Sequence, residues 1–309
     1  MVLPFLDAMP ISSIATSPAI DLSALPPPAI VAQPDFEARV AAKIARLLVT
    51  LPAFDALVES DPAIKLLEAD SYDEMLLAQA CNDAARQMLI AFATGANLDH
   101  LGALYGVTRL VITPADLETG APAVLESDEE LRARILLAPH SFSVAGPEMA
   151  YVYHAMAASG DVLHASATSP TPGQVVVSVL SRTGDGTAPP ATLDAVEAVL
   201  TDDHVRPLTD EVIVQSADIV DFNIVAQLWL YAGPDPDLIL ATAQASLAAL
   251  LAKAKRLGRD IPRSAIIAAL HVAGVQRVVL PSPAADIVIT SLQAGNAAAI
   301  AVTIAGYDE

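Results

Sequence analysis

The chain has 309 residues, a length that predicts two or three domains with cores large enough to exclude water. Its 16 Lys and Arg against 36 Asp and Glu leave a formal charge of −20, which argues against binding to nucleic acid or to an anionic membrane. Only 17% of the residues are charged while 54% are hydrophobic, so we expect apolar surface to be buried against partner proteins.

The sequence predicts no membrane insertion and no disulfide. The longest apolar candidate, residues 238–252, is interrupted by Gln244 and Ser246 and is shorter than the ~20 residues that a membrane span needs. The first residues lack the basic segment of a signal peptide. A single cysteine, Cys81, excludes an internal disulfide and a cysteine-based zinc site. These features fit synthesis in a reducing cytoplasm.

Residues 1–34 are predicted to form an extended, proline-rich arm, which either lies on a neighbouring protein or is a loose tail. A helical bundle region follows over residues 35–111. Its first helix carries an apolar stripe at helical spacing, made of Phe36, Val40, Ile44, Leu47 and Leu51.

A longer second helix is predicted over residues 63–93. Its polar stripe is narrow, and its apolar side is wide enough that several neighbours must cover it. The region has few other helices, so we infer that this side packs against other chains. Cys81 is interpreted as an inert thiol within the apolar side. The residues expected in the interface are Tyr72, Leu77, Cys81, Met88 and Phe92.

A third, short helix is expected to end at Gly106 and to point three leucines inward: Leu98, Leu101 and Leu104. Residues 112–125 contain prolines and are predicted to be a linker. The acidic run after Ser127 resembles a cluster of catalytic carboxylates, but a capping box at a helix start explains the same spacing. We interpret this run as structural.

Residues 126–216 are predicted to form a central α/β domain with its elements in the order helix, strand, strand, helix, strand. Pro147 opens the first helix and Gly160 ends it. The second helix is marked by Leu193, Val196 and Leu200. The strands are expected at 162–167, 174–180 and 211–215.

Residues 217–309 are predicted to form a C-terminal α/β domain that begins with a strand of strict alternation over 220–231. Trp229 and Tyr231 lie near the end of this strand. Trp229 is either a residue covered by a second layer or a hot spot for a partner, and we include both aromatics in the predicted interface. Two helices follow, with further strands at 275–280, 287–290 and 298–304.

Two helices of the α/β domains carry apolar residues and a terminal glycine at matching offsets, one ending at Gly160 and the other at Gly274. Each has a proline in its first turn and is predicted to precede a pair of strands. We therefore hypothesise two related helix–strand–strand units, one in each domain.

The sequence motifs of common enzymes do not occur in the chain. There is no P-loop, no dinucleotide fingerprint, no nucleophile elbow and no His-Glu-x-x-His sequence. The six histidines show no i, i+4 pairing, and His154 and His164, ten residues apart around Gly160, make a poor metal pair. We predict no catalytic residue, no metal site, no cofactor and no enzymatic activity.

Five long stretches resemble the baseplate J-like family of contractile-tailed phages. The resemblance covers the chain in continuous order from about residue 20 to the C-terminus. The stretches are ATGANLDHLGALYGVTRLVITP (93–114), LESDEELRARILLAP (125–139), SVAGPEMAYVYHA (143–155), SATSPTPGQVVVSVLSRTGDGT (166–187) and GRDIPRSAIIAALHVAGVQRVVLPSPAADI (258–287).

This resemblance implies a structural protein of the baseplate wedge at the tail tip. It implies that two copies associate with a smaller wedge protein through a shared bundle of N-terminal helices. It also implies that the C-terminal α/β domains contact neighbouring wedges to close a ring around the hub, with sheath-initiator and hub proteins as further partners. Such an assembly would account for the wide apolar side of the 63–93 helix.

Together, the residues and the resemblance predict an α+β multidomain chain, in which an N-terminal helical region precedes two small α/β sandwich-like domains with mixed sheets. The expected location is the virion, in the tail baseplate, with assembly in the host cytoplasm. Two alternatives from other classes stay open: another virion-associated binding or adhesion module, and a tail-associated hydrolase, which would need a pocket with convergent carboxylates or histidines.

Overall fold

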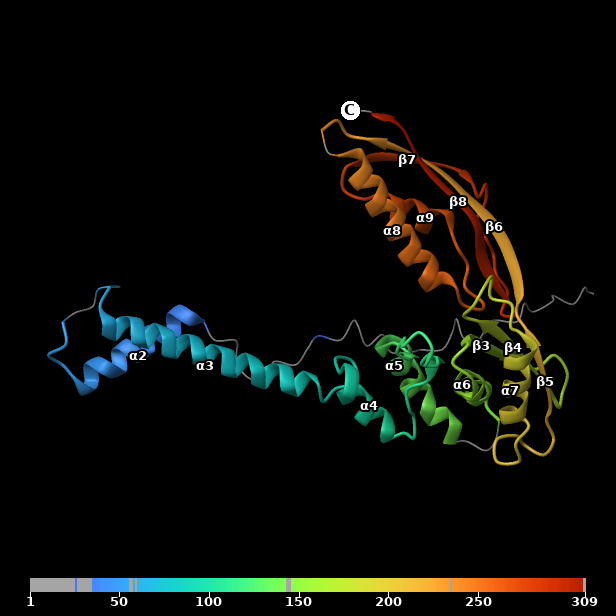
Figure 1. Cartoon of the computed structure of the whole chain (residues 1–309), viewed down its shortest axis with the longest axis horizontal. Helices are drawn as coiled ribbons and strands as arrows, with labels where there is room; N and C mark the ends of the chain where they lie inside the picture. The colour runs from blue at the N-terminus through green and yellow to red at the C-terminus, as the bar shows by residue number, and fades with distance from the viewer. Residues whose placement is uncertain are drawn as a thin grey trace, which may run out of the picture. The chain divides into compact units, whose positions relative to one another are not determined.

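A computed structural model describes residues 26, 35–55, 58, 60–142, 146–233 and 235–307. The arm predicted for residues 1–34 lies outside the described residues, apart from Pro26. The described chain falls into two compact units, one within residues 35–108 and 128–132 and the other within residues 109–127 and 133–307. Helices dominate the first unit and small mixed sheets the second, which confirms the predicted α+β class (Figure 1).

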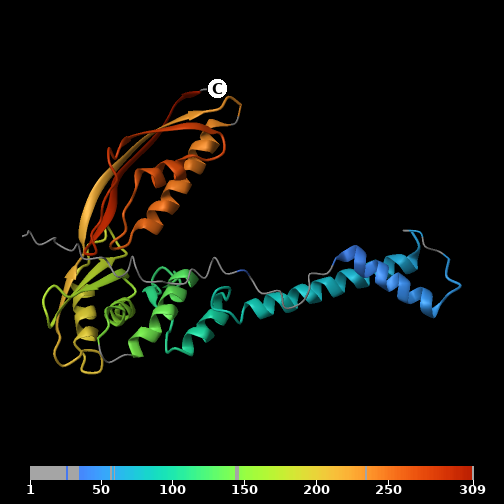
Figure 2. The same cartoon turned by 180° about the vertical axis from the view of Figure 1, so that it is seen from behind.

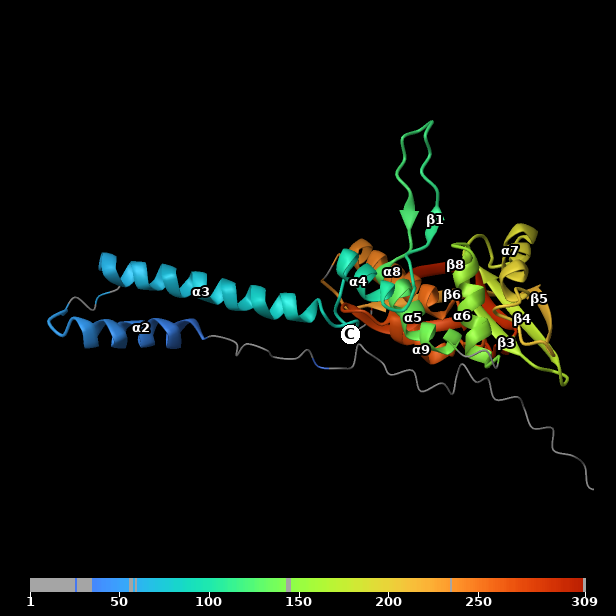
Figure 3. The same ribbon diagram turned by 90° about the horizontal axis from the view of Figure 1, so that it is seen from below.

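The first unit begins with two helices, α2 (Phe36–Thr50) and α3 (Pro62–Arg86), which lie side by side (Figures 1 and 3). Asp35 caps α2 by accepting a hydrogen bond from the amide of Glu37, and Asp61 caps α3 in the same way. Lys43 of α2 lies 2.6 Å from a carboxylate oxygen of Asp70 and 3.1 Å from one of Glu74. The hydrogen bond from Lys43 lowers the pKa of the Glu74 carboxyl.

The helix predicted over 63–93 ends earlier, at Arg86. The side chain of Gln87 explains the difference, because its Oε1 accepts a hydrogen bond from the Thr94 amide and its Nε2 donates to the Phe92 carbonyl. These bonds stabilise a series of turns over residues 87–94, where the sequence predicted two more turns of helix. Met88 and Phe92 therefore lie beyond the end of α3.

The next helix, α4 (Gly95–Ala103), ends near the glycine that the sequence indicates. Gly106 has φ +71°, and the amide of Val107 donates back to the Gly102 carbonyl. Leu98 is fully buried, but Leu104 is 77% exposed, so the prediction that it points inward is wrong. The helix has already ended when the chain reaches Leu104, and its side chain no longer follows the inward stripe.

A narrow β-ribbon occupies the interval expected to be a linker. Its strands β1 (Val111–Thr113) and β2 (Val124–Leu125) are antiparallel, and Figure 3 shows the ribbon projecting as a finger. At its base, Glu126 makes two hydrogen bonds of 2.6 and 2.7 Å with Arg134 of α5 (Asp128–Leu137), and both side chains are only 4% exposed. The same carboxylate accepts from the Leu110 amide.

The central sheet confirms the predicted order of elements. After the short 3₁₀ helix η2 (Ala138–Phe142) come α6 (Glu148–Ala158), β3 (Val162–Thr168), β4 (Gln174–Ser181), α7 (Pro190–Leu200) and β5 (Glu211–Ser216). The strands lie in the order β3-β4-β5, with β3 antiparallel and β5 parallel to β4. The core between sheet and helices includes Tyr151, Ala155, Val177, Val196 and Leu200.

The second sheet is built around the alternating strand, β6 (Asp218–Leu230). It is followed by α8 (Pro236–Ala254), α9 (Arg263–Leu270), β7 (Val275–Ser282) and β8 (Gln293–Tyr307). The strand order is β7-β6-β8, with β7 antiparallel and β8 parallel to β6. Both helices lie on one face of this sheet (Figures 1 and 2), and its core includes Ile224, Leu228, Ala243, Leu247 and Ile266.

The strand predicted at 287–290 is absent from the described structure. Ile287 makes only an isolated bridge to Ile261, and the amide of Ile289 donates to the Asp260 side chain. The backbone of this segment therefore hydrogen-bonds to the loop before α9. It does not pair with a strand of the sheet.

The hypothesis of two helix–strand–strand units is wrong as stated. In the central sheet β3 and β4 are adjacent, but β7 and β8 are separated by β6. The two sheets share a simpler plan, in which a middle strand has one antiparallel neighbour, preceded by a helix, and one parallel neighbour. Matching offsets in α6 and α9 reflect the equivalent helix before the antiparallel strand.

We predict that Glu126→Ala lowers the stability of the second unit strongly, by about 3–5 kcal/mol, because it leaves the Arg134 guanidinium buried without its carboxylate. Thermal unfolding followed by circular dichroism measures the effect. Glu118→Ala is the matched control, since Glu118 is exposed on the same ribbon. Equal unfolding temperatures for the two variants would show that the buried pair contributes nothing to stability.

Candidate interaction surface

Helix α3 has a side that no described helix covers. Its buried residues (Ile64, Ser71, Ala78 and Asn82) fall on one side at helical spacing. The opposite side carries exposed apolar residues over about five turns, with the exposed Asp73 among them, namely Leu66, Ala69, Tyr72, Leu76, Leu77, Ala80 and Ala84. Leu77 is 67% exposed and Leu66 is 71% exposed. Contiguous apolar side chains on a helix surface mark a place where another protein binds.

The structure keeps the five predicted N-terminal interface residues exposed or partly exposed. Tyr72, Leu77 and Cys81 are exposed on α3 itself. Met88 is 76% exposed and Phe92 is half-buried, and both belong to the turns after the helix. The five therefore share one unit of the chain but do not form a single helical stripe.

The thiol of Cys81 is exposed, so its interpretation as a core thiol is wrong. Cys81 lies seven residues after Glu74 and eleven after Asp70, on the stripe of α3 that bonds to α2, but beyond those contacts its side chain stays exposed. Leu66, which the sequence analysis did not single out, lies eleven residues before Leu77, a spacing of three helical turns that would have revealed it.

The two C-terminal aromatics belong to the other compact unit. The guanidinium carbon of Arg277 lies 4.9 Å from the ring centroid of Trp229, and a side chain at Gly306 would meet the same ring at 3.0 Å. Trp229 is therefore partly covered by its own sheet. Tyr231 is about half exposed, just beyond the end of β6.

The tip of the β-ribbon is a further apolar feature that composition did not reveal. Asp116 holds the turn by accepting from the Thr119 hydroxyl at 2.6 Å and from the Glu118 amide at 2.8 Å, and these bonds lower the pKa of its carboxyl. Within this ordered turn Leu117 is 96% exposed. Because hydrogen bonds already order this turn, a partner that binds Leu117 would cause little further loss of conformational entropy.

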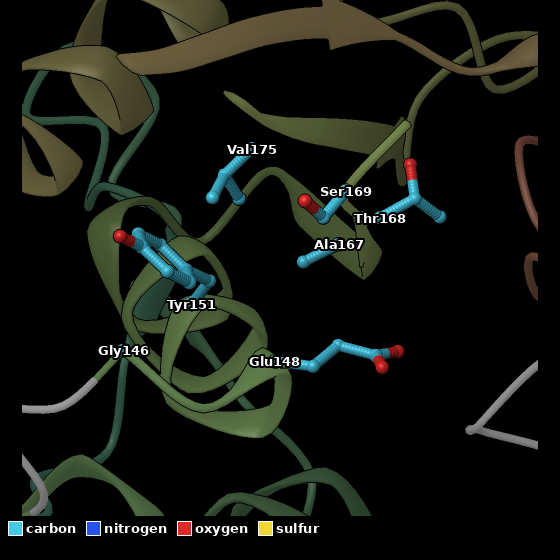
Figure 4. Close-up of a pocket in the computed structure, with 7 residues that line it drawn as sticks. All are labelled: Gly146, Glu148, Tyr151, Ala167, Thr168, Ser169 and Val175. Atoms are coloured by element: carbon cyan, nitrogen blue, oxygen red, sulfur yellow. The ribbon is translucent and has the colours of Figure 1, made fainter. Parts of the chain in front are cut away.

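A pocket of about 120 Å³ lies between α6 and the central sheet (Figure 4). Glu148 is its only carboxylate, and Figure 4 shows it pointing away from the Tyr151 hydroxyl. Burial, together with a 2.8 Å hydrogen bond to Asp210, raises the pKa of Tyr151. Ser169 donates to the Thr171 carbonyl and not to a side chain that could act as its base.

The described residues contain no group of three or more His, Cys, Asp or Glu side chains placed to hold a metal ion. Desolvation lowers the pKa of His154, and it lowers that of His164 to about 4. Both imidazoles are therefore neutral near pH 7.

Among the described residues, α8 is the one helix long and apolar enough to cross a membrane. Four of its side chains are instead buried in the core of the second sheet: Ile239, Ala243, Leu247 and Ala254. This one-sided packing is the arrangement of a helix that covers one face of a sheet and leaves its other side exposed.

We predict that a water-soluble disulfide reagent modifies Cys81 rapidly in the free chain, since the thiol is exposed. In assembled particles the same thiol should react at least about tenfold more slowly, because a partner covers it. Absorbance of the released thiolate gives both rates. A slow reaction in the free chain would contradict the exposed position of α3.

Three family models match in succession: the Baseplate J-like N-terminal domain over residues 59–116, the Baseplate J-like central domain over 143–216 and the Baseplate J-like protein C-terminal domain over 222–303. The chain is also 46% identical over 301 residues to baseplate protein J of Escherichia phage P2, an alignment that spans 94% of this chain and all of the phage protein. The chain belongs to the baseplate J-like family.

Proposed function

We propose that the chain is a structural component of the baseplate wedge of a contractile phage tail or a related contractile injection system. In this proposal it assembles with a second copy of itself and a smaller wedge protein, and the wedges form a ring around the tail hub. Membership of the baseplate J-like family supports the baseplate role. The uncovered apolar side of α3 is the observation that carries the assembly role.

The physical driving force is burial of the α3 side. Each large apolar side chain that becomes covered contributes about 1.5–3 kcal/mol before the cost of association is subtracted. The exposed leucines and Tyr72 flank smaller residues, Ala69, Ala80 and Ala84, which allow a neighbouring helix to approach closely. Two helices from one copy, joined by those of a second copy and a smaller protein, would form a closed bundle with this side inside.

The charge of the chain supports the same role. A net charge of −20 keeps free subunits soluble and disfavours premature binding to nucleic acid. The remaining partners in this proposal are neighbouring wedges, the sheath initiator and the hub. The proposed location is the tail baseplate of the virion, with assembly in the host cytoplasm, and the protein acts without catalysis, cofactor or membrane insertion.

We predict that Leu77→Asp or Met88→Asp abolishes formation of the wedge, because each places a charge within an apolar interface. The readout is co-purification of the tagged chain with the other wedge components after co-expression. Circular dichroism and thermal unfolding of the purified variants should show that the α/β domains remain folded.

Leu208→Asp is the matched control, because it makes the same leucine-to-aspartate change outside α3. Leu208 is fully exposed on the loop before β5. This variant should assemble like the unaltered chain. A wedge that survives Leu77→Asp would remove the proposal that this side of α3 is the shared interface.

A further inference from the structure

Strand β8 forms one border of the second sheet. The order β7-β6-β8 leaves the outer backbone groups of β8 without a neighbouring strand among the described residues. The strand is 15 residues long, whereas most strands have about five or six. A long border strand is a ready template for pairing with another chain unless side chains protect it.

The two borders of this sheet differ in protection. Strand β7 carries Arg277 and Pro281, a charge and a residue without an amide N–H, which are the usual means of blocking a border strand. Strand β8 has the sequence QAGNAAAIAVTIAGY, with no charged residue and no proline. In a chain with a net charge of −20, this border lacks both a charge and a proline, and its only irregularities are the register shifts against β6 at Ala298 and Ala305.

Exposure is concentrated in the middle of β8. Ala298, Ala299, Ile300 and Ala301 are all exposed. The register with β6 skips Ala298, so the alternation of faces is interrupted there. Ile300 lies opposite the buried Ile224 and is nevertheless 49% exposed, whereas Ala299 and Ala301 lie opposite exposed residues. Its neighbour β6 shows the ordinary alternation of buried and exposed positions over the same interval. The centre of β8 is therefore open on both faces as well as along its border.

We propose that β8 pairs in antiparallel fashion with β8 of a second copy of this chain, with the two-fold axis near Ile300. This register places Ala299 opposite Ala301 and Ala298 opposite Val302. The seam then contains alanine, isoleucine and valine side chains on both strands and brings no like charges together. The three-stranded sheet becomes a continuous sheet of six strands, with an isologous interface.

The neighbouring helix supports a second copy as the occupant. An antiparallel seam with its two-fold axis perpendicular to the sheet leaves the helices of both copies on the same face. Helix α8 packs beside β8, whereas α9 packs beside β7, so the seam brings the two α8 helices toward each other. Residues 238–252 of α8 contain no charged side chain, and two equally acidic copies meet there without repulsion.

This inference deepens the proposed assembly role by naming a contact between copies, and it does not depend on α3. The test uses the full-length chain with Cys81→Ala, which removes the native thiol. Ile300→Cys in this background should give a disulfide-linked dimer on mild oxidation, because the two thiols face each other across the axis. Val288→Cys is the control, since Val288 is 73% exposed in the same domain but lies outside β8.

A second variant tests the edge without a thiol. Ala301→Lys should lower the association constant of the copies at least about tenfold in analytical ultracentrifugation, and Val288→Lys should leave it unchanged. Equal cross-linking of the 288 and 300 thiols, or no dimer from Ile300→Cys, would overturn the inference. If that happens while Leu77→Asp still prevents wedge formation, the β8 contact is wrong and the proposed function stands.

Discussion

The uncovered side of α3 is the constraint on which the assembly role depends. Helix α3 has 25 residues and α2 has 15, so at 1.5 Å per residue they extend about 37 and 22 Å. A shorter helix on one side of a longer one leaves much of its circumference in water. The exposed Leu66, Tyr72 and Leu77 lie on that remainder. In the proposed assembly, a neighbouring protein buries the apolar side chains that α2 leaves exposed on α3.

The second unit contrasts with the first because its sheets are built around their own cores. Each has a middle strand with fully buried side chains and helices that cover one face. The buried pair of Glu126 and Arg134 fixes the base of the ribbon, so that the ordered tip with Leu117 has a defined position within this unit. The ribbon and the β8 border therefore belong to a stably folded unit. This agrees with the proposed role of holding other proteins in place.

Much of the fold could be predicted from the sequence because local patterns determine it. The alternation of β6, the proline and glycine punctuation of α6, and the cap at Gly106 depend on residues close together in the chain, and all three are confirmed. The α3 interface was predicted from a wide apolar face and remains a proposal. Its exposure to solvent in the single chain is what the pattern implies.

The predictions that failed depend on contacts that no local pattern reports. Gln87 ends α3 early through hydrogen bonds to residues five and seven positions away. The segment at 287–290 resembles a strand, but the Asp260 side chain and Ile261 backbone take its hydrogen bonds. The proposed repeat failed because matching helices do not determine where β8 is inserted in a sheet. The β8 border was not singled out, since its significance appears only once the strand order is known.

Electron cryo-microscopy of intact tails tests the central claim most directly, by locating this chain and showing what surrounds α3. The account predicts that Leu66, Tyr72 and Leu77 contact helices of other polypeptides within a ring of repeated copies at the tail tip. Density showing this side of α3 open to solvent, or covered entirely by the same polypeptide's own α/β domains, would contradict it.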